Sequence, residues 1–194
     1  LGVHYRSSVK HQLDGDVAID NNGTFVSGYE AAAKLALPDI LQLGVDHKIN
    51  DKWSVQAGAT WFGWNSFDEI RVIDKAGVQA DSVTVQNYQT TWAFAVGAEY
   101  ILDDKWTLRA GYQFDETPTT DLYRTSRTPD GDRQWFAAGA TYEINDKLSL
   151  DLAAVYIDVA EEDINVSRNA SLVNVRAKAD QEIGIFSLGL NYKF

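Results

Sequence analysis

The chain has 194 residues, enough for one domain with a sizeable core. Its 28 acidic and 17 basic residues give a formal net charge of −11, which argues against nucleic acid as a partner. The absence of cysteine excludes disulfides and thiolate chemistry. No apolar run approaches the roughly 18 residues expected of a membrane-spanning helix.

Apolar and polar residues alternate along the whole chain, which is typical of strands with two different faces. The stretch WSVQAGATW (residues 53–61) and the terminal FSLGLNYKF (residues 186–194) both place apolar residues at every second position. Only EAAAKLAL (residues 30–37) is predicted to be helical, over at most two turns. Eight strands are predicted, over about residues 2–17, 36–49, 53–72, 84–102, 106–116, 134–144, 147–160 and 173–194.

The connections between these strands alternate in length. Three are short and polar, namely residues 50–52, 103–105 and 145–147, and their asparagine and aspartate residues suit tight turns. The other four are long, over about residues 18–35, 73–83, 117–133 and 161–172. Short turns at one end and long loops at the other are the layout of an outer-membrane β-barrel.

In five of the predicted strands, over residues 53–61, 92–102, 106–114, 136–144 and 148–156, the face with the larger apolar residues carries no charged residue, whereas Glu99, Arg109 and Asp151 lie on the other face. A soluble barrel has its polar face outside, so the charge-free face is predicted to contact lipid. Aromatic residues eight positions apart on this face, such as Trp53 and Trp61, would be separated by a rise of roughly 20 Å, close to the roughly 25 Å apolar band of such barrels. The alternative, a soluble β-sandwich, explains neither the loop asymmetry nor the charge-free face.

The sequence therefore predicts an all-β protein, an antiparallel transmembrane β-barrel of eight up-and-down strands in the bacterial outer membrane. The tight turns and the C-terminus are expected to be periplasmic and the long loops extracellular. A last strand that ends in Phe194 is similar to the terminal signature that the outer-membrane assembly machinery recognises. That machinery, membrane lipid and lipopolysaccharide are the expected macromolecular and lipid partners.

Several stretches resemble the C-terminal half of the long-chain fatty acid transport family (FadL, OmpP1/TodX). They are GVHYRSSVKHQLDGD (residues 2–16), Leu37-Pro38-Asp39, WFGWNSF (residues 61–67), DETP (residues 115–118) and PDGDRQW (residues 129–135). The matches occur in the same order as in the family and extend over essentially the whole chain. The resemblance implies a fourteen-stranded barrel with an N-terminal hatch that carries long-chain fatty acids or, as second choice, aromatic hydrocarbons.

The resemblance also implies that residues 1–194 form a single barrel domain equivalent to strands seven to fourteen, without the hatch and the first six strands. The absence of methionine and of a signal peptide points the same way. Eight strands nevertheless suffice to close a small barrel, so closure of the first strand on the last stays open. The alternative function is a small structural barrel or surface-interaction protein without a transport path.

A fatty acid carboxylate in an apolar pocket needs a cationic partner, because an unpaired buried charge is costly. The candidate substrate-binding residues of this kind are Arg6, Lys10, Arg109 and Arg133, with Trp135 beside the last of them. In the alternative interpretation these cations pair with acidic residues to satisfy a polar barrel interior. Those acidic residues are Asp46, Glu99, Glu143 and Asp151.

Phe62 and Trp64 lie near the outer rim, where they either hold a hydrophobic ligand or pack beneath a loop. The segment from residue 22 to residue 37 matches a family loop near the external ligand groove, and its predicted helix would present apolar residues to ligand or lipopolysaccharide.

No enzyme activity, cofactor or metal site is expected. None of the three histidines, His4, His11 and His47, is predicted on an outer loop beside a serine or an acid pair. The acidic runs 128–132 and 161–163 are expected to be solvated loop charge rather than calcium sites, because neither forms a full twelve-residue calcium loop.

Overall fold

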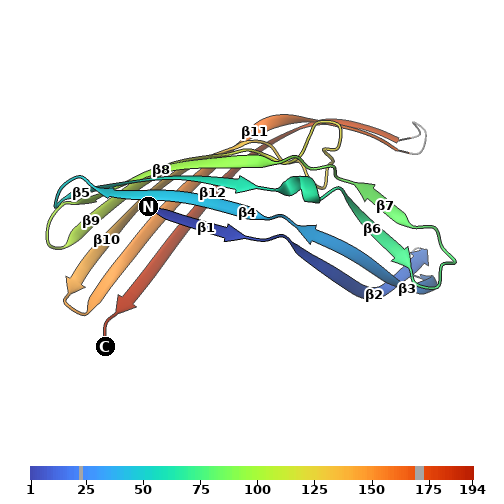
Figure 1. Cartoon of the computed structure of the whole chain (residues 1–194), viewed down its shortest axis with the longest axis horizontal. Coiled ribbons are helices and arrows are strands. Elements are labelled where there is room, and N and C mark those ends of the chain that lie inside the picture. Colours follow the sequence, from blue (N-terminus) through green and yellow to red (C-terminus); the bar gives the residue numbers. More distant parts are fainter. Residues whose placement is uncertain (22–23, 169–172) are drawn as a thin grey trace.

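The computed structural model describes residues 1–21, 24–168 and 173–194, and these are almost entirely antiparallel strand (Figure 1). The described residues contain no helix that is long and apolar enough to cross a membrane. The larger sheet has the strand order β1 (Gly2–Arg6), β4 (Ile40–Lys48), β5 (Trp53–Phe62), β8 (Thr91–Ile101), β9 (Trp106–Asp115), β10 (Arg133–Asn145), β11 (Leu148–Arg168) and β12 (Val173–Tyr192). A second sheet has the order β2 (Val9–Asn21), β3 (Thr24–Leu37), β6 (Glu69–Asp74) and β7 (Ser82–Val85).

The eight-stranded antiparallel sheet confirms the predicted fold class. The sheet is open, because β1 and β12 are its two edges and no pairing joins them within the described ranges. Each edge strand therefore has a neighbour on one side only, β4 in one case and β11 in the other. Of the two forms that the sequence left open, the structure has the open sheet rather than the closed small barrel.

Each strand of the second sheet continues a strand of the larger sheet on the far side of a short break. Along the chain, β1 is followed by β2, β3 by β4, β5 by β6 and β7 by β8. The second sheet therefore extends beyond the ends of β1, β4, β5 and β8 (Figure 1). Pro38 and the positive φ of 44° at Asn87 lie at two of these interruptions. The predicted strands 2–17, 53–72 and 84–102 are thus each broken in two, a correction of the sequence prediction.

The predicted helix at residues 30–37 is wrong, and so is the prediction that residues 18–35 and 161–168 are loop, because β2, β3 and β11 extend into these segments. Of the predicted loop 73–83, residues 75–81 do lie outside the strands. EAAAKLAL forms the second half of β3, which pairs with β2 from Val9 opposite Leu37 as far as Asn21 opposite Thr24. Alanine favours a helix locally. Pairing with β2, however, gives a hydrogen-bond partner to the backbone N–H and C=O groups of every second residue of the segment, and this pairing outweighs the helical preference. Residues 22–23 of this segment and residues 169–172 of the last predicted loop lie outside the described residues.

The three tight turns share one hydrogen-bonding pattern. The side-chain oxygen of Asn50 accepts bonds from the backbone N–H groups of residues 52 and 53, both at 2.9 Å. Asp103 accepts two such bonds at 2.8 Å, and Asn145 accepts two at 3.0 and 3.1 Å. The side chain thus replaces a backbone partner within each turn, as the prediction from asparagine and aspartate required.

The strand registers place the predicted charge-free positions on one continuous outer face. Ring pairs lie near both of its ends: Trp106 and Tyr142 are 4.6 Å apart at the tight-turn end, and Tyr112 and Phe136 are 5.3 Å apart at the other. The large side chains between these belts are exposed, for example Val96 at 57%. A face of this kind, apolar and rimmed by aromatic rings, is suited to contact lipid.

Outside the aromatic belts, Asp74 organises the connection between β6 and β7. Its side chain is 4% exposed and accepts bonds from the backbone N–H groups of Gln79 at 2.8 Å and of Ala76 and Val78 at 2.9 Å. These backbone donors, that of Gln79 first, lower the pKa of Asp74 below its ordinary value. The carboxylate form therefore stabilises the folded hairpin.

We expect this hairpin to loosen in acid. Because the folded pKa of Asp74 is lowered, its contribution is fully present above the unfolded value of about 3.9 and is lost as the pH falls through the folded pKa. Hydrogen exchange at the amides of residues 76–79, corrected for intrinsic rates, should accelerate below about pH 4. The Asp74→Asn variant carries no charge at any pH, so an identical acid response in that variant would rule out this explanation.

Candidate functional site

A row of polar side chains crosses the inner face, the one opposite the outer face, near its tight-turn end. The Arg109 guanidinium donates to Glu99 at 2.8 Å and to the Thr141 hydroxyl at 2.7 Å. Thr141 in turn donates to Asp151 at 2.5 Å, and the Asn191 amide donates to the same carboxylate. Because the five residues come from five neighbouring strands, the row links the inner face of β8 to β12, five of the eight strands of the sheet.

Arg109 is therefore already engaged by a carboxylate, as the alternative interpretation of the sequence supposed for the inner cations. On β4 and β5 the carboxylate of Asp46 also has a partner, but this partner is an amide: Gln56 donates to it at 2.7 Å. The role of Arg109 in binding substrate stays a prediction.

Farther from the tight turns, the inner face of β10 to β12 becomes apolar. The inner apolar patch consists of Trp135, Ala137, Val155, Ile157, Ile183 and Ile185. The registers align Trp135 with Ile157 and Ile183, and Ala137 with Val155 and Ile185. Ile183 and Ile185 are 43% and 45% exposed, whereas Ile157 is buried.

The interior of a water-filled porin is polar, so an uncovered apolar patch on the inner face suits contact with an apolar molecule. Sequence reasoning identified only Trp135 of this patch. The signal that it missed is the pair of short runs in which both strand faces are apolar, residues 152–157 and 183–186.

Arg133 lies on the same inner face of β10 as Trp135, two residues closer to the long loops. Its guanidinium forms ion pairs with Asp115 at 2.9 Å and with Asp130 at 2.7 Å, and the Asp130 carboxylate also accepts from the Thr117 hydroxyl at 2.7 Å. One cation is thus shared by two carboxylates. A ligand carboxylate would have to displace one of them, so a direct contact of Arg133 with substrate stays a prediction.

Residues 116–132, here named the capping loop, fold back onto the upper part of β11 and β12. Within it the Arg124 side chain is 2% exposed, pairs with Asp121 at 2.6 Å and Glu162 at 3.1 Å, and donates to the backbone carbonyl of Asp130 at 2.8 Å. The Gln181 amide donates to the Pro129 carbonyl at 2.6 Å. These bonds tie the loop to both strands of the last hairpin.

Close packing also fixes the capping loop. A Cβ atom at Gly131 would lie 2.6 Å from the carbonyl oxygen of Ala160, so a side chain does not fit there without displacing the backbone. Val159, which packs beneath this glycine, is 5% exposed. The loop thus closes the upper border of the inner apolar patch.

The indole Nε1 atom of Trp135 is buried and has no hydrogen-bond partner among the described residues. An unpaired buried donor of this kind is uncommon and calls for an acceptor from water or a ligand.

The remaining predicted site residues lie elsewhere. Arg6 ends β1 and is exposed, and Lys10 lies past the interruption in β2, so neither joins Arg109 or Arg133. Phe62 ends β5, and Trp64 lies in the 3-10 turn η1 (Trp64–Ser66). The Trp64 ring is 6.4 Å from that of Phe67 and 5.9 Å from that of Tyr88.

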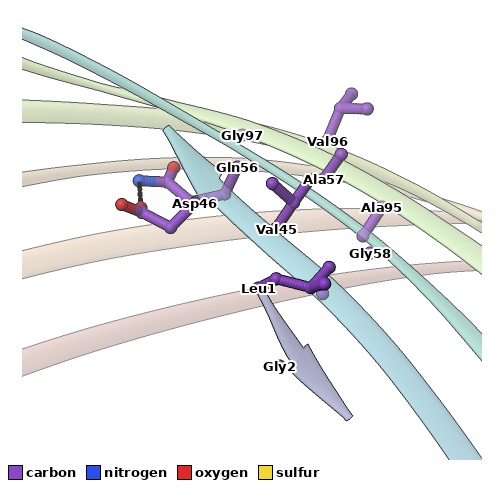
Figure 2. Close-up of a pocket in the computed structure, with 11 residues that line it drawn as sticks. Leu1, Gly2, Val45, Asp46, Gln56, Ala57, Gly58, Ala95, Val96 and Gly97 are labelled. Carbon is purple, nitrogen blue, oxygen red and sulfur yellow. Dashed lines mark hydrogen bonds between the residues drawn. The ribbon is translucent and has the colours of Figure 1, made fainter. Parts of the chain in front are cut away.

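A shallow hollow of about 560 Å³ lies over β1, β4, β5 and β8 (Figure 2). Glycine and alanine form much of its lining, and the registers align Gly2, Gly44 and Gly58 in one row across the sheet. Figure 2 also shows the Gln56–Asp46 hydrogen bond at its side. None of the predicted substrate-binding residues lines this hollow.

An antiparallel sheet with an apolar outer face, aromatic belts and a mixed inner face is typical of outer-membrane β-barrel proteins. The chain belongs to the family described as outer membrane protein transport protein (OMPP1/FadL/TodX), whose sequence model matches residues 1–194. The members of this family are outer-membrane transport proteins, which agrees with the expectation that the chain is not an enzyme.

Curated relatives support the assignment. The chain is 25% identical over 207 residues to a long-chain fatty acid transport protein of Escherichia coli O6:H1, a match that covers 100% of this chain and 46% of the relative. It is 29% identical over 202 residues to outer membrane protein P1 of Haemophilus influenzae, covering 100% of this chain and 44% of that protein. The chain thus spans less than half the length of these relatives.

The solved structures give the same result. A FadL homologue of Pseudomonas aeruginosa superposes with a TM-score of 0.80 at 28% identity, covering 98% of this chain and 48% of that one. The toluene transporter TbuX of Ralstonia pickettii superposes with a TM-score of 0.62 at 20% identity, covering 98% and 43% respectively, which shows a shared fold. The Pseudomonas aeruginosa structure agrees with the family resemblance that the sequence motifs indicated.

Proposed function

We propose that this chain forms part of the wall of an outer-membrane barrel that carries hydrophobic molecules, foremost long-chain fatty acids, across the membrane. The observation that carries this proposal is the inner apolar patch, because it offers an uncovered apolar surface on the face that would otherwise be polar. The name of the Escherichia coli relative, a long-chain fatty acid transport protein, supports the choice of substrate. Aromatic hydrocarbons are the second substrate class.

Among the predicted contacts, Trp135 is best placed for this role. Its ring is part of the patch, which offers an apolar surface to the ligand, and its indole N–H is a buried donor without a partner among the described residues. Arg109 and Arg133 already have carboxylate partners, so their proposed part in binding requires that a ligand carboxylate displaces Glu99, Asp115 or Asp130.

We further propose that residues 1–194 are the C-terminal portion of a larger barrel. An unpaired strand edge within lipid leaves N–H and C=O groups unsatisfied at several kcal/mol each, so the open edges of β1 and β12 favour pairing with further strands. The match to less than half of each relative supports the same proposal. A small structural barrel, the alternative function, would instead require β1 to pair with β12.

The proposed orientation follows the asymmetry of the connections. The tight turns and Phe194 face the periplasm, where the terminal aromatic residue is available to the assembly machinery. The long connections, including the capping loop and the β2–β3 hairpin, face the exterior, where they meet lipopolysaccharide.

Polar substitution of the inner apolar patch tests the transport proposal. In the complete protein, Ile183→Asn combined with Ile185→Asn should weaken binding and uptake of a long-chain fatty acid by about thirtyfold, because covering the exposed part of each isoleucine is worth about 1 kcal/mol, or about 2 kcal/mol for the pair. Uptake is measured in liposomes, and assembly is monitored by the heat-dependent gel mobility of the barrel.

Ser187→Asn, two positions further on the same inner face, provides the control and should leave uptake unchanged. Wild-type uptake in the double variant, or absence of uptake by the unmodified protein, would contradict the proposed function.

A further inference from the structure

The last hairpin continues well beyond the aromatic belt at the long-loop end. Tyr156 belongs to this belt, since its ring lies 6.4 Å from that of Phe136, and it is aligned with Gly184 on β12. From Gly184 back to Val175, β12 covers roughly 30 Å of strand at about 3.3 Å per residue. The upper parts of β11 and β12 therefore project beyond the belt as a two-stranded ribbon (Figure 1).

On this ribbon β12 keeps one face apolar. The β12 row consists of alternate residues of the strand, namely Val175, Ala177, Ala179, Ile183 and Ile185. The remaining alternate position is Gln181, and its amide donates to the Pro129 carbonyl at 2.6 Å. Every position on the opposite face from residue 174 to residue 182 is polar: Asn174, Arg176, Lys178, Asp180 and Glu182.

The β12 row leads without a break into the inner apolar patch, of which Ile183 and Ile185 are members. The register of the hairpin shifts between Val159 and Glu162, but the extra residue belongs to β11 and not to β12. The alternation of β12 is therefore uninterrupted, and Val175 lies on the same face as Ile183.

The two strands of the ribbon differ in how far this face is covered. On β11, Val159 and Ile164 are 5% and 6% exposed, and Glu162 between them pairs with Arg124 of the capping loop. On β12, Val175 is 40% exposed, and Ala177 is exposed as well. Within the described residues, the capping loop is thus bonded over the β11 half and leaves the β12 row open beside it.

A strand that meets water on both faces is expected to be polar on both. The β12 row is instead apolar over its whole described length, and an exposed apolar surface of this kind marks a place of contact with another apolar group. Its lower end is the inner apolar patch, so the molecule that suits the patch also suits the row. Because the row carries no charge, it matches an alkyl chain and not a headgroup.

We propose that the β12 row is an entry track along which the hydrocarbon chain of a long-chain amphiphile reaches the inner apolar patch. The proposal rests on the proposed function and adds the route by which the substrate approaches. The capping loop borders this track on one side, where the bond between Gln181 and Pro129 holds it beside the row.

The test places single cysteines in the complete protein, because residues 1–194 contain none. Ala177→Cys lies on the row, whereas Lys178→Cys faces the other way, and both positions are exposed. With the protein in phospholipid vesicles, labelling by a water-soluble maleimide is followed with and without dodecanol, an uncharged probe with a long alkyl chain. Dodecanol should slow the labelling of Ala177→Cys severalfold and leave that of Lys178→Cys unchanged.

A second variant tests the neighbouring side chain. Val175→Asn, added to Ala177→Cys, should raise the half-protecting dodecanol concentration by about fourfold, the effect of leaving about one methylene group uncovered. Arg176→Asn, the adjacent position on the polar face, is the matched control and should leave that concentration unchanged.

Unchanged labelling of Ala177→Cys, equal slowing at both cysteines, or equal half-protecting concentrations for Val175→Asn and Arg176→Asn overturns the track. Labelling of Ala177→Cys that is already slow without dodecanol also overturns it, because another part of the complete protein then covers the row. Fatty acid uptake by the unmodified protein tests transport separately. Normal uptake without protection contradicts the track alone, whereas absence of uptake contradicts the proposed function.

Discussion

Replacing Ala138 by arginine is expected to lower the free energy of unfolding in a bilayer by about 2–4 kcal/mol, the cost of a cationic side chain on the lipid face near the midplane. Ala138 lies on the outer face of β10, between the belts that Phe136 and Tyr142 mark on the same strand, and is aligned with Ala110 and Ala154. Urea unfolding of the complete protein in phospholipid vesicles measures the change.

Ala137 provides the matched control, because it is the adjacent residue of the same type and faces inward, between Gly111 and Val155. Ala137→Arg places the same charge at an exposed position of the inner face, which does not contact lipid, so we expect a much smaller loss of stability. If the two variants lose the same free energy, the assignment of outer and inner faces is wrong.

Arg124→Ala is expected to release the capping loop from the last hairpin. The arginine is 2% exposed and Glu162 is 25% exposed, so its removal leaves a partly buried carboxylate without its cation. Loss of one partner of a buried pair costs roughly 3 kcal/mol, at the lower end of the usual range because Asp121, the other partner, is 89% exposed. Limited proteolysis should then cleave within residues 117–132 while the barrel retains its heat-dependent gel mobility.

Arg127→Ala is the control within the same loop. The Arg127 side chain is exposed, and its one hydrogen bond to the described residues is that from its backbone N–H to the Thr125 hydroxyl. Cleavage of Arg127→Ala at the wild-type rate and rapid cleavage of Arg124→Ala are the expected pair of results. Protection of the loop in both variants would show that Arg124 does not hold it.

Local signals account for the parts of the fold that the sequence predicted. The side chains of Asn50, Asp103 and Asn145 close their own turns, so the turn positions depend on residues only two or three positions apart. Strict alternation then fixes which side chains share a face, because a slip of one residue would move charged residues such as Arg109 into lipid.

The parts that were not predicted depend on residues far apart in the chain. EAAAKLAL adopts a strand because β2 pairs with it, a long-range partner that overrides the local helical preference. For Arg133 the sequence left both a ligand carboxylate and an acidic partner open, and it named neither of the actual partners, Asp115 from the preceding strand and Asp130 from the folded capping loop. The inner apolar patch likewise exists only once Trp135, Ile157 and Ile183 are aligned across three strands.

The second sheet has a consequence for the order in which the chain folds. β1 and β4 are separated by more than thirty residues, so bringing Arg6 next to Ile40 in an unstructured chain carries a considerable loop-closure entropy. Once the β2–β3 hairpin has formed as far as the pair Val9 and Leu37, only a few unpaired residues separate β1 from β4. Arg6 and Ile40 are then already neighbours. The β6–β7 hairpin acts in the same way for β5 and β8. Distant strand pairs thus become local ones, which is the condition for rapid folding.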